Sequence, residues 1–381
     1  MKLLLTPSCL EGTVTPPPSK SLLHRELICR CLAGQSTALP PHAAQDVLAT
    51  QRALLCLTED GAPVADCGGS GSTLRFLLPI FMAMGRTGAS FTGSSRLMQR
   101  PVPGELGLRA EGERLVVTRP LTAGRWELPG GETSQLISGM LLALPLLKGD
   151  SDIIITGGSV SRPYLRMTAA VMAHHGVTAV PTAEGYHIPG GQAYHPAPLL
   201  EEPDWSATAF WLVLKALAAQ RGGGALRVPL PPPPYLQGDA VAEAYLERLP
   251  PCVDIADTPD LLMPLALYAA MQPGKTTRFV NGAFLRKKES DRLAAVTATL
   301  NALGGQVREE ADGLSVIGVT ALRGGEVSAW DDHRIAMMAG CAAMTAQGCV
   351  TLTGAECVAK SYPAFWRELA ALGGKWEVLE P

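Results

Sequence analysis

The feature that most constrains the fold of this 381-residue chain is a pattern that recurs six times. Each copy begins with a short stretch rich in Gly, Ser, Asp or Pro, continues into an apolar run and ends at a glycine. Polar N-caps and C-terminal glycines are typical of helix boundaries, so each copy predicts a helix. The leading stretches begin at Pro18, Gly68, Gly131, Asp204, Thr258 and Trp330, and the closing glycines are Gly34, Gly85, Gly149, Gly222, Gly274 and Gly348.

The predicted helices are apolar on nearly every side, as residues 76–82 illustrate. Such helices are buried rather than laid on a surface. A strand-like stretch often follows, such as 151–156 or 350–353, and a second polar stretch then introduces a more amphipathic helix. This order is typical of a β-α-β-α-β-β unit. The second stretches begin at Gln45, Ser95, Ser161, Asp239, Arg286 and Ala359.

Six units in a chain of this length predict two domains of three units each, because one domain holds roughly 100–200 residues. We expect an α/β fold with buried helices and sheets outside them. The Pro- and Gly-rich segment 222–238, with four prolines at 231–234, marks either a domain boundary or a surface loop.

Composition narrows the class of protein. The formal net charge of −3 argues against a general nucleic-acid binder, which would carry a basic excess. Apolar runs are shorter than the roughly 18–20 residues of a membrane span, and residues 1–5 are too short for a signal peptide. The nine irregularly spaced cysteines, including Cys29 and Cys31 within an apolar helix, are read as reduced thiols rather than zinc ligands. We therefore expect a cytoplasmic protein that uses no metal and no cofactor.

Cations and hydroxyls recur at the polar starts of the predicted helices. Helix N-termini attract phosphates and carboxylates, so these side chains predict a binding site for anions, although each alone could be a surface charge or an N-cap. The cations are Lys20, Arg25, Arg75, Arg100, Arg292, Arg334 and Lys360, and the hydroxyls are those of Ser21, Thr133, Ser134 and Ser161.

Two acidic residues stand among these cations. Asp260 could be a dipole partner at a helix start, and Glu289 lies in the charged run 287–292, which could be a solvated face. A carboxylate in a cationic pocket stays ionised and can carry protons. The stretch 68–73 does not match a P-loop, because the Gly-Lys-Ser/Thr ending is absent.

Nine motifs, in order along nearly the whole chain, resemble those of the enolpyruvyl transferases. The match is closest to the branch of that family that joins phosphoenolpyruvate to shikimate 3-phosphate. The motifs are Ser19-Lys20-Ser21 with Arg25, Cys67–Arg75, Arg100-Pro101, Ser134-Gln135, Ser161–Tyr164, Pro259-Asp260, Arg286–Arg292, Asp332–Arg334 and Ala359-Lys360.

The resemblance implies a two-domain, inside-out α/β barrel, with three β-α-β-α-β-β units and buried helices in each domain. The family's chain crosses between its domains twice. This implies one domain from residues 1–19 and 203–381, with cations for phosphoenolpyruvate and the catalytic acids. The other, 20–202, would hold shikimate 3-phosphate, and the proline run would be a loop within a domain.

The resemblance also implies two sets of ligands. Shikimate 3-phosphate would be held by Lys20, Ser21, Arg25, Thr133, Ser134, Gln135, Ser161, Tyr164, Asp260 and Lys288. Phosphoenolpyruvate would be held by Lys20, Gly71, Arg100, Gln135, Arg292, Arg334 and Lys360. Glycine at 71 would let the backbone approach the ligand closely.

The implied reaction transfers the enolpyruvyl group of phosphoenolpyruvate to the 5-hydroxyl of shikimate 3-phosphate, through a tetrahedral intermediate, on the route to chorismate and the aromatic amino acids. Asp260 would act as base toward the hydroxyl and Glu289 as acid toward C3 of phosphoenolpyruvate, with Lys20 nearby. The family is usually monomeric, and glyphosate occupies its phosphoenolpyruvate pocket.

Some positions depart from the family pattern. Pro17-Pro18 replaces the usual Pro-Gly, Gly69 and Ser72 replace Asn and Thr, and Phe284 stands where a polar residue is common, which puts one substrate hydrogen bond in doubt. Two alternatives remain open. One is the branch acting on UDP-N-acetylglucosamine, whose reactive cysteine has no counterpart in the loop 92–99. The other is a non-catalytic anion-binding paralogue.

Overall fold

A computed structural model describes residues 1–40, 42–99, 106–131, 134–220, 222–223 and 225–380, apart from the side chain of Ser159. The chain divides into two compact units. Unit 1 comprises Met1–Pro18 and Glu202–Pro381, and unit 2 comprises Ser19–Glu201. Each unit is described by itself.

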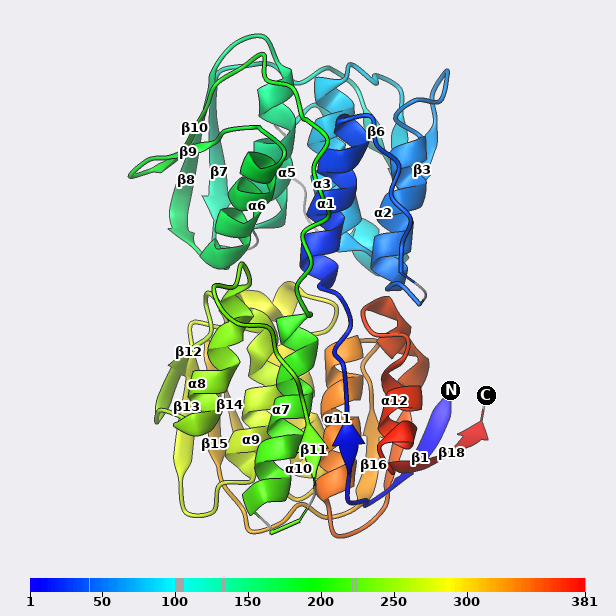
Figure 1. Cartoon of the computed structure of the whole chain (residues 1–381), viewed down its shortest axis with the longest axis vertical. Helices are drawn as coiled ribbons and strands as arrows, with labels where there is room; N and C mark the ends of the chain where they lie inside the picture. Colours follow the sequence, from blue (N-terminus) through cyan, green and yellow to red (C-terminus); the bar gives the residue numbers. More distant parts are fainter. Residues whose placement is uncertain (41, 100–105, 132–133, 221, 224, 381) are drawn as a thin grey trace. The chain divides into compact units, whose positions relative to one another are not determined.

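In the described residues of unit 2, two helices come first and the strands begin after them (Figure 1). Its elements are α1 (Lys20–Leu32), α2 (Gln45–Leu55), β3 (Val64–Asp66), α3 (Gly71–Ala83), β4 (Ser90–Thr92), α4 (Ser95–Met98), β5 (Leu108–Glu111), β6 (Arg114–Val117), β7 (Arg125–Gly130), α5 (Gln135–Ala143), η2 (Leu144–Leu146), β8 (Ser151–Ser159), α6 (Arg162–His174), β9 (Val180–Pro181) and β10 (Gly185–Ile188).

Unit 1 combines the first strands of the chain with its second half. Its elements are β1 (Lys2–Thr6), β2 (Gly12–Thr13), α7 (Trp205–Gln220), β11 (Leu226–Arg227), η3 (Gly238–Val241), α8 (Ala242–Glu247), β12 (Cys252–Asp254), η4 (Pro259–Leu261), α9 (Leu262–Ala270), β13 (Thr276–Val280), η5 (Ala283–Lys287), α10 (Arg292–Ala302), β14 (Gln306–Glu310), β15 (Gly313–Ile317), β16 (Gly325–Ser328), α11 (His333–Thr345), β17 (Val350–Thr353), η6 (Ala355–Lys360), α12 (Phe365–Ala371) and β18 (Lys375–Glu380).

The four-stranded sheets share one topology. Their orders are β3-β4-β6-β5 and β7-β8-β10-β9 in unit 2, and β12-β13-β15-β14 and β16-β17-β1-β18 in unit 1. In each, a parallel pair joined through a helix is extended by two antiparallel strands. The mixed α/β class is thus confirmed, and β1 completes a sheet made by the end of the chain.

The finer prediction of three complete β-α-β-α-β-β units per domain fits only in part. Two stretches lack a four-stranded sheet: α1 and α2 have none in the described residues, and α7 and α8 are accompanied by the two-stranded pair β11-β2. The strand pairings of the described residues do not join the sheets into one barrel. The extended segment 192–202 forms no ladder, so backbone pairing there is replaced by contacts such as that from the Arg30 Nη1 to the Ala197 carbonyl at 2.6 Å.

All six predicted apolar runs are helices, namely α1, α3, α5, α7, α9 and α11, and they form the core of their units. Every residue of α11 is buried. In unit 1, α7, α9, α10 and α11 pack together with strands on either side (Figure 1). Within the polar leading stretches, the side chains of Ser19, Ser70 and Asp332 are the N-caps that accept hydrogen bonds from the first turns of α1, α3 and α11. Helix starts are therefore held by these polar residues.

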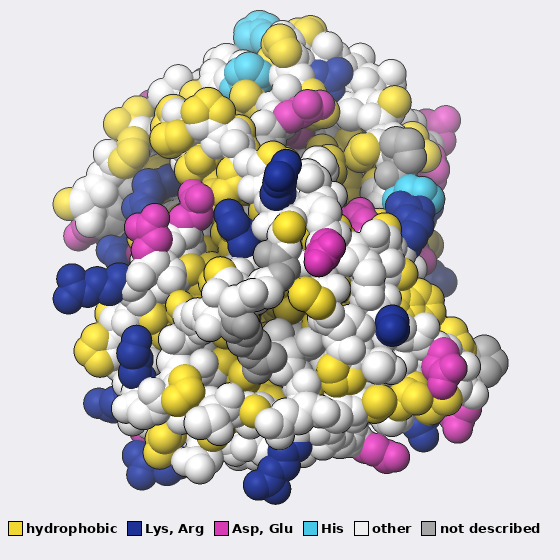
Figure 2. Space-filling model, turned by 60° about the horizontal axis from the view of Figure 1, so that its bottom comes forward, with side chains coloured by type: hydrophobic (Ala, Val, Ile, Leu, Met, Phe, Trp, Pro, Cys, Tyr) yellow, Lys and Arg dark blue, Asp and Glu magenta, His cyan; other side chains and the backbone are white. Residues whose placement is uncertain are grey.

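The surface has no large field of one charge sign on the face in Figure 2, where Lys and Arg alternate with Asp, Glu and apolar side chains. Several cations of the predicted site are instead buried, including Arg25, Arg75, Arg292 and Arg334. In the described part of the chain, no helix is long and apolar enough to span a membrane.

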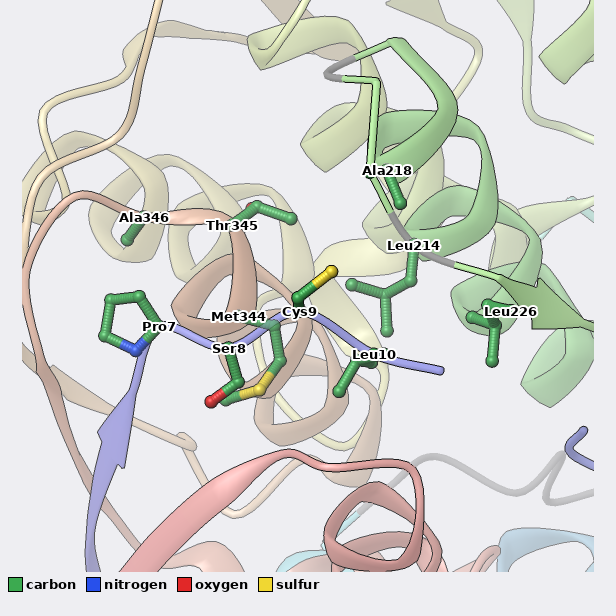
Figure 3. Close-up of a pocket in the computed structure, with 11 residues that line it drawn as sticks. Pro7, Ser8, Cys9, Leu10, Leu214, Ala218, Leu226, Met344, Thr345 and Ala346 are labelled. Atoms are coloured by element: carbon green, nitrogen blue, oxygen red, sulfur yellow. The ribbon is translucent and has the colours of Figure 1, made fainter. Parts of the chain in front are cut away.

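A cavity of about 260 Å³ lies in unit 1 at the C-terminal ends of α7 and α11 (Figure 3). Its walls include Leu10, Leu214, Leu226 and Met344, and none of the described residues that line it is charged. The cavity therefore lacks the cations that the sequence predicts for an anion-binding site.

Candidate active site

The centre of the charged cluster in unit 1 is Arg292, the first residue of α10. Asp291 caps this helix by accepting from the Ala294 amide. The Arg292 guanidinium donates from Nη1 to Asp260 at 2.7 Å, from Nη2 to Glu289 at 3.0 Å and from Nε to Asp332 at 2.8 Å. One arginine therefore orients both of the carboxylates that were predicted from the sequence to transfer protons.

Asp260 is held between two arginines. It lies on η4, and its second oxygen accepts from Arg334 Nη2 on α11 at 2.7 Å. Its side chain keeps 18% exposure, whereas Arg292 and Arg334 keep 3% and 4%. This arrangement stabilises an ionised carboxylate that solvent or a ligand can still reach.

Glu289 has a second cationic neighbour. Lys360, the last residue of η6, places its ammonium 4.0 Å from Oε1, and both side chains keep a little exposure, 17% and 15%. Burial acts to lower the pKa of Arg292, but the charges of Asp332, Glu289 and Asp260 outweigh it and hold this pKa well above its ordinary value. The arginine thus stays charged, and Glu289 can exchange protons beside a permanent cation.

Lys288 packs against the residue that departs from the family pattern. Its ammonium lies 5.4 Å from the ring centre of Phe284, which is buried. A cation–π contact of this kind is worth roughly 0.5–2 kcal/mol and orients the lysine. Phe284 therefore positions the predicted substrate ligand Lys288 through its ring face.

Lys20 in unit 2 is paired with an acid that the prediction left out. It is the first residue of α1, and its ammonium lies 2.9 Å from Asp46 Oδ2 near the start of α2. Both side chains are largely buried, at 12% and 7% exposure. A buried ion pair fixes the position of the ammonium at the helix start.

Gln135 joins the starts of α5 and α3. Its Nε2 donates to Ser72 Oγ at 3.2 Å, and its Oε1 accepts from Arg75 Nη1 at 3.3 Å. Gly71 is buried in the same turn, as the first residue of α3. The structure thus brings Gly71, Ser72, Arg75 and Gln135 together. Ser72, which replaces the threonine of the family pattern, accepts a hydrogen bond there.

Arg25 is enclosed within unit 2 and keeps 2% exposure. Its guanidinium donates to Thr168 Oγ1 at 2.7 Å and to the carbonyls of Ser21 and Tyr164 at 2.6 and 3.1 Å, and it lies 4.8 Å from the Phe76 ring centre. Burial lowers its pKa to about 10. In this state Arg25 braces α1 against α6, while its contact with substrate stays a prediction.

The hydroxyls of Ser134 and Ser161 are not used as helix caps, although both residues occupy N-cap positions. Ser161 has a left-handed backbone with φ of 58°, which is unfavourable for a residue with a Cβ. Both residues are buried to within 6% exposure. Sequence reasoning could not detect the strain at Ser161, because the motif Ser-Arg-Pro-Tyr reads as an ordinary helix start.

Three acids beside predicted site residues were not predicted, two in unit 1 and one in unit 2. Asp332 is fully buried and accepts from Arg292, from Ser290 Oγ at 3.0 Å and from the Arg334 amide at 3.0 Å. Asp46 and Asp239 are the other two. All three stood in predicted helix starts, which gave no signal of their distant partners.

Arg100 and Thr133 lie outside the described residues. Among the described residues, no group of acidic, His and Cys side chains is arranged to hold a metal.

Comparisons with known proteins show the family of the chain. The family model for EPSP synthase (3-phosphoshikimate 1-carboxyvinyltransferase) matches residues 57–249 and 237–369. The 3-phosphoshikimate 1-carboxyvinyltransferase of Clostridium acetobutylicum is 35% identical, over 97% of each chain. That of Methanocorpusculum labreanum is 32% identical, over 98% of this chain and 99% of its own.

The fold has solved counterparts. A structure of EPSP synthase from Acinetobacter baumannii covers 100% of both chains with a TM-score of 0.71 and 20% sequence identity. The buried helices, the repeated sheets and the cluster of cations and carboxylates define an α/β transferase for anionic substrates. The chain belongs to the EPSP synthase (3-phosphoshikimate 1-carboxyvinyltransferase) family, whose members are transferases of the shikimate pathway.

Proposed function

We propose that this chain transfers the enolpyruvyl group of phosphoenolpyruvate to the 5-hydroxyl of shikimate 3-phosphate and releases phosphate. The observation that carries this proposal is the Asp260–Arg292–Glu289 cluster, in which two partly exposed carboxylates share one buried arginine. Full-length relatives with this activity support it. The product enters the route to chorismate and the aromatic amino acids.

The cations hold the charges of phosphoenolpyruvate. Arg292 and Arg334 provide planar donors that suit a carboxylate or a phosphate, and Lys20 and Lys360 act as compact charges. These groups are paired with Asp260, Glu289 and Asp46 in the structure, so substrate anions would compete with protein carboxylates for the same cations. The proposed ligands of phosphoenolpyruvate are Lys20, Gly71, Arg100, Gln135, Arg292, Arg334 and Lys360.

The second substrate is held by hydroxyls and by a different group of side chains. Ser134 and Ser161 support this role because their hydroxyls are not consumed as helix caps. The strained backbone at Ser161 fixes the direction of its side chain. The proposed ligands of shikimate 3-phosphate are Lys20, Ser21, Arg25, Thr133, Ser134, Gln135, Ser161, Tyr164, Asp260 and Lys288.

Two proton carriers account for addition and elimination. Asp260 takes the proton of the 5-hydroxyl while the oxygen of that hydroxyl forms a bond to C2 of phosphoenolpyruvate. Glu289 protonates C3. In the elimination, Glu289 takes a proton back from C3, the C2–O bond to phosphate breaks, and the proton on Asp260 leaves with the phosphate. Lys20 and the arginines stabilise the charge that develops on the intermediate.

The domain roles are also part of the proposal. Residues 1–19 and 203–381 form the domain with the catalytic acids and cations for phosphoenolpyruvate, and residues 20–202 form the domain for shikimate 3-phosphate. The compact units, which divide at residues 18/19 and 201/202, support these boundaries. Three units per domain would complete an inside-out α/β barrel, in a protein that acts as a monomer in the cytoplasm. Glyphosate would compete with phosphoenolpyruvate at Gly71.

Replacement of the two acids tests the mechanism. Asp260→Ala and Glu289→Ala should each lower kcat by roughly 100-fold or more, the usual contribution of a general acid or base. Binding of shikimate 3-phosphate, measured by calorimetry, should weaken far less. Glu326→Gln on the exposed face of β16 is the matched control. Unchanged turnover in either variant would remove that residue from the mechanism.

A further inference from the structure

Besides Asp260, Glu289 and Asp332, unit 1 holds another buried carboxyl. Asp239 is on η3, keeps 2% exposure and stands outside both predicted ligand sets. The 3-10 helices η3 and η4, which carry Asp239 and Asp260, both pack against α7. Two acids from separate segments are therefore anchored on one helix.

Ser206, in the first turn of α7, fixes the orientation of Asp239. The buried Ser206 hydroxyl donates a short hydrogen bond to Asp239 Oδ2. The neighbouring Gln237 accepts from the Trp205 amide at 3.1 Å and donates to Glu202 Oε2 at 2.9 Å. Backbone and side-chain contacts on both sides thus hold η3 in place.

The charged groups around Asp239 come from three elements. Asp260 on η4 and Asp204 at the start of α7 disfavour its ionised form, while Arg334 on α11 and the Ser206 hydroxyl favour it. Burial is the largest influence, and together these effects raise the pKa of Asp239 to about 7. This acid therefore changes charge near neutral pH, next to the Asp260–Arg334 pair.

We propose that Asp239 is a positioning residue for the reaction: its buried charge sets how strongly Asp260 takes the proton of the attacking hydroxyl. When Asp239 is ionised, its negative charge opposes a second charge on Asp260 and makes Asp260 a stronger base. Ionised Asp239 also attracts Arg334, and this attraction weakens the interaction between Arg334 and Asp260. The inference rests on the proposed function of Asp260.

Asp239→Asn and Ser206→Ala should change the pH profile of kcat in different ways. The Asn variant keeps the shape and lacks the charge at every pH, so the rise of kcat that follows ionisation of Asp239 should be lost and the plateau should fall by roughly 3–10-fold. The Ala variant loses the donor that favours ionised Asp239, so the same rise should occur at higher pH and reach the wild-type plateau. Glu326→Gln should leave the profile unchanged.

Thermal stability gives a readout that does not need turnover. A raised pKa means that the contribution of Asp239 to stability is present below its ordinary pKa and is lost as pH rises through about 7. The difference between the Tm of Asp239→Asn and that of the wild type should therefore increase, in favour of the variant, from pH 5 to pH 8. In an Asp260→Asn background this gain should shrink, because the second carboxylate no longer raises the pKa of Asp239.

The outcomes separate the inference from the proposed function. A wild-type chain without turnover would sink the proposed function, and the Tm comparison would still decide whether Asp239 and Asp260 are coupled. An active wild type whose pH profile is the same in both variants would overturn the inference, as would an Asn variant that keeps the wild-type rise of kcat or a Tm gain that Asp260→Asn does not alter.

Discussion

Ser161 illustrates how one residue can carry strain for a function. Its φ of 58° places a non-glycine residue in the left-handed region, at a cost of roughly 1–2 kcal/mol. Glycine would adopt this conformation freely, yet only serine supplies a hydroxyl. The strain and the unused cap position support the proposal that the Ser161 hydroxyl binds shikimate 3-phosphate.

Two substitutions at Ser161 separate these effects. Ser161→Ala keeps the strain and loses the hydroxyl, and Ser161→Gly loses both. Each should raise the KM for shikimate 3-phosphate by roughly 10-fold, the value of one charge-assisted hydrogen bond. The Tm of the Gly variant should exceed that of the Ala variant. An unchanged KM in both variants would exclude the hydroxyl from substrate binding.

Residue identity alone did not reveal every partner in the site. The cations were visible because Lys20, Arg292 and Arg334 stand where apolar helices begin. Their counter-ions Asp46 and Asp332 were hidden, because an acid at a helix start is a common cap or dipole partner. Such pairs depend on contacts between segments that are distant in the sequence. Lys20 and Asp46, for example, are 26 positions apart.

The helices were the most predictable elements of the fold. Their apolar runs, polar caps and closing glycines act locally, so all six appear where the pattern places them. The strands are short and depend on pairing. The segments beside α1 and α7 follow the same sequence pattern as the others, but in the described residues they have no four-stranded sheet. Local signals could not distinguish these cases.

Gly139 sets the approach of two core helices in unit 2. A Cβ at this position of α5 would lie 2.2 Å from the Arg75 carbonyl oxygen and 3.0 Å from the Phe76 Cα in α3. The two helices therefore pack closely through a residue without a side chain. This contact also fixes the distance between Arg75 and Gln135, which hydrogen-bond at the helix starts.

Gly139→Ala should thus separate α3 from α5. We expect a loss of about 1–3 kcal/mol in the free energy of unfolding, as for an overpacked core, together with a higher KM for phosphoenolpyruvate. Gly34→Ala is the control: a Cβ there meets nothing within 4 Å, but φ is 74°. It should lose only about 1 kcal/mol and keep its KM. Equal effects on KM would contradict the packing argument.

At the scale of the whole molecule, unit 1 is built from segments at both ends of the sequence. The β1 strand pairs with β17 and β18, so the N-terminal segment completes the sheet beside α11 and its Arg334. In unit 1, the Asp204 amide donates to the Pro17 carbonyl at 2.7 Å, and Pro18 pairs with Pro203. Pro17 and Pro18, which differ from the family pattern, therefore lie where the two segments of unit 1 meet.

The most direct test of the central claim is phosphate release from phosphoenolpyruvate by the purified chain, with either shikimate 3-phosphate or UDP-N-acetylglucosamine as acceptor. The account predicts rapid release with shikimate 3-phosphate, loss of that release in Asp260→Ala, and none above background with the sugar nucleotide. No release with shikimate 3-phosphate, or equal release with both acceptors, would contradict it.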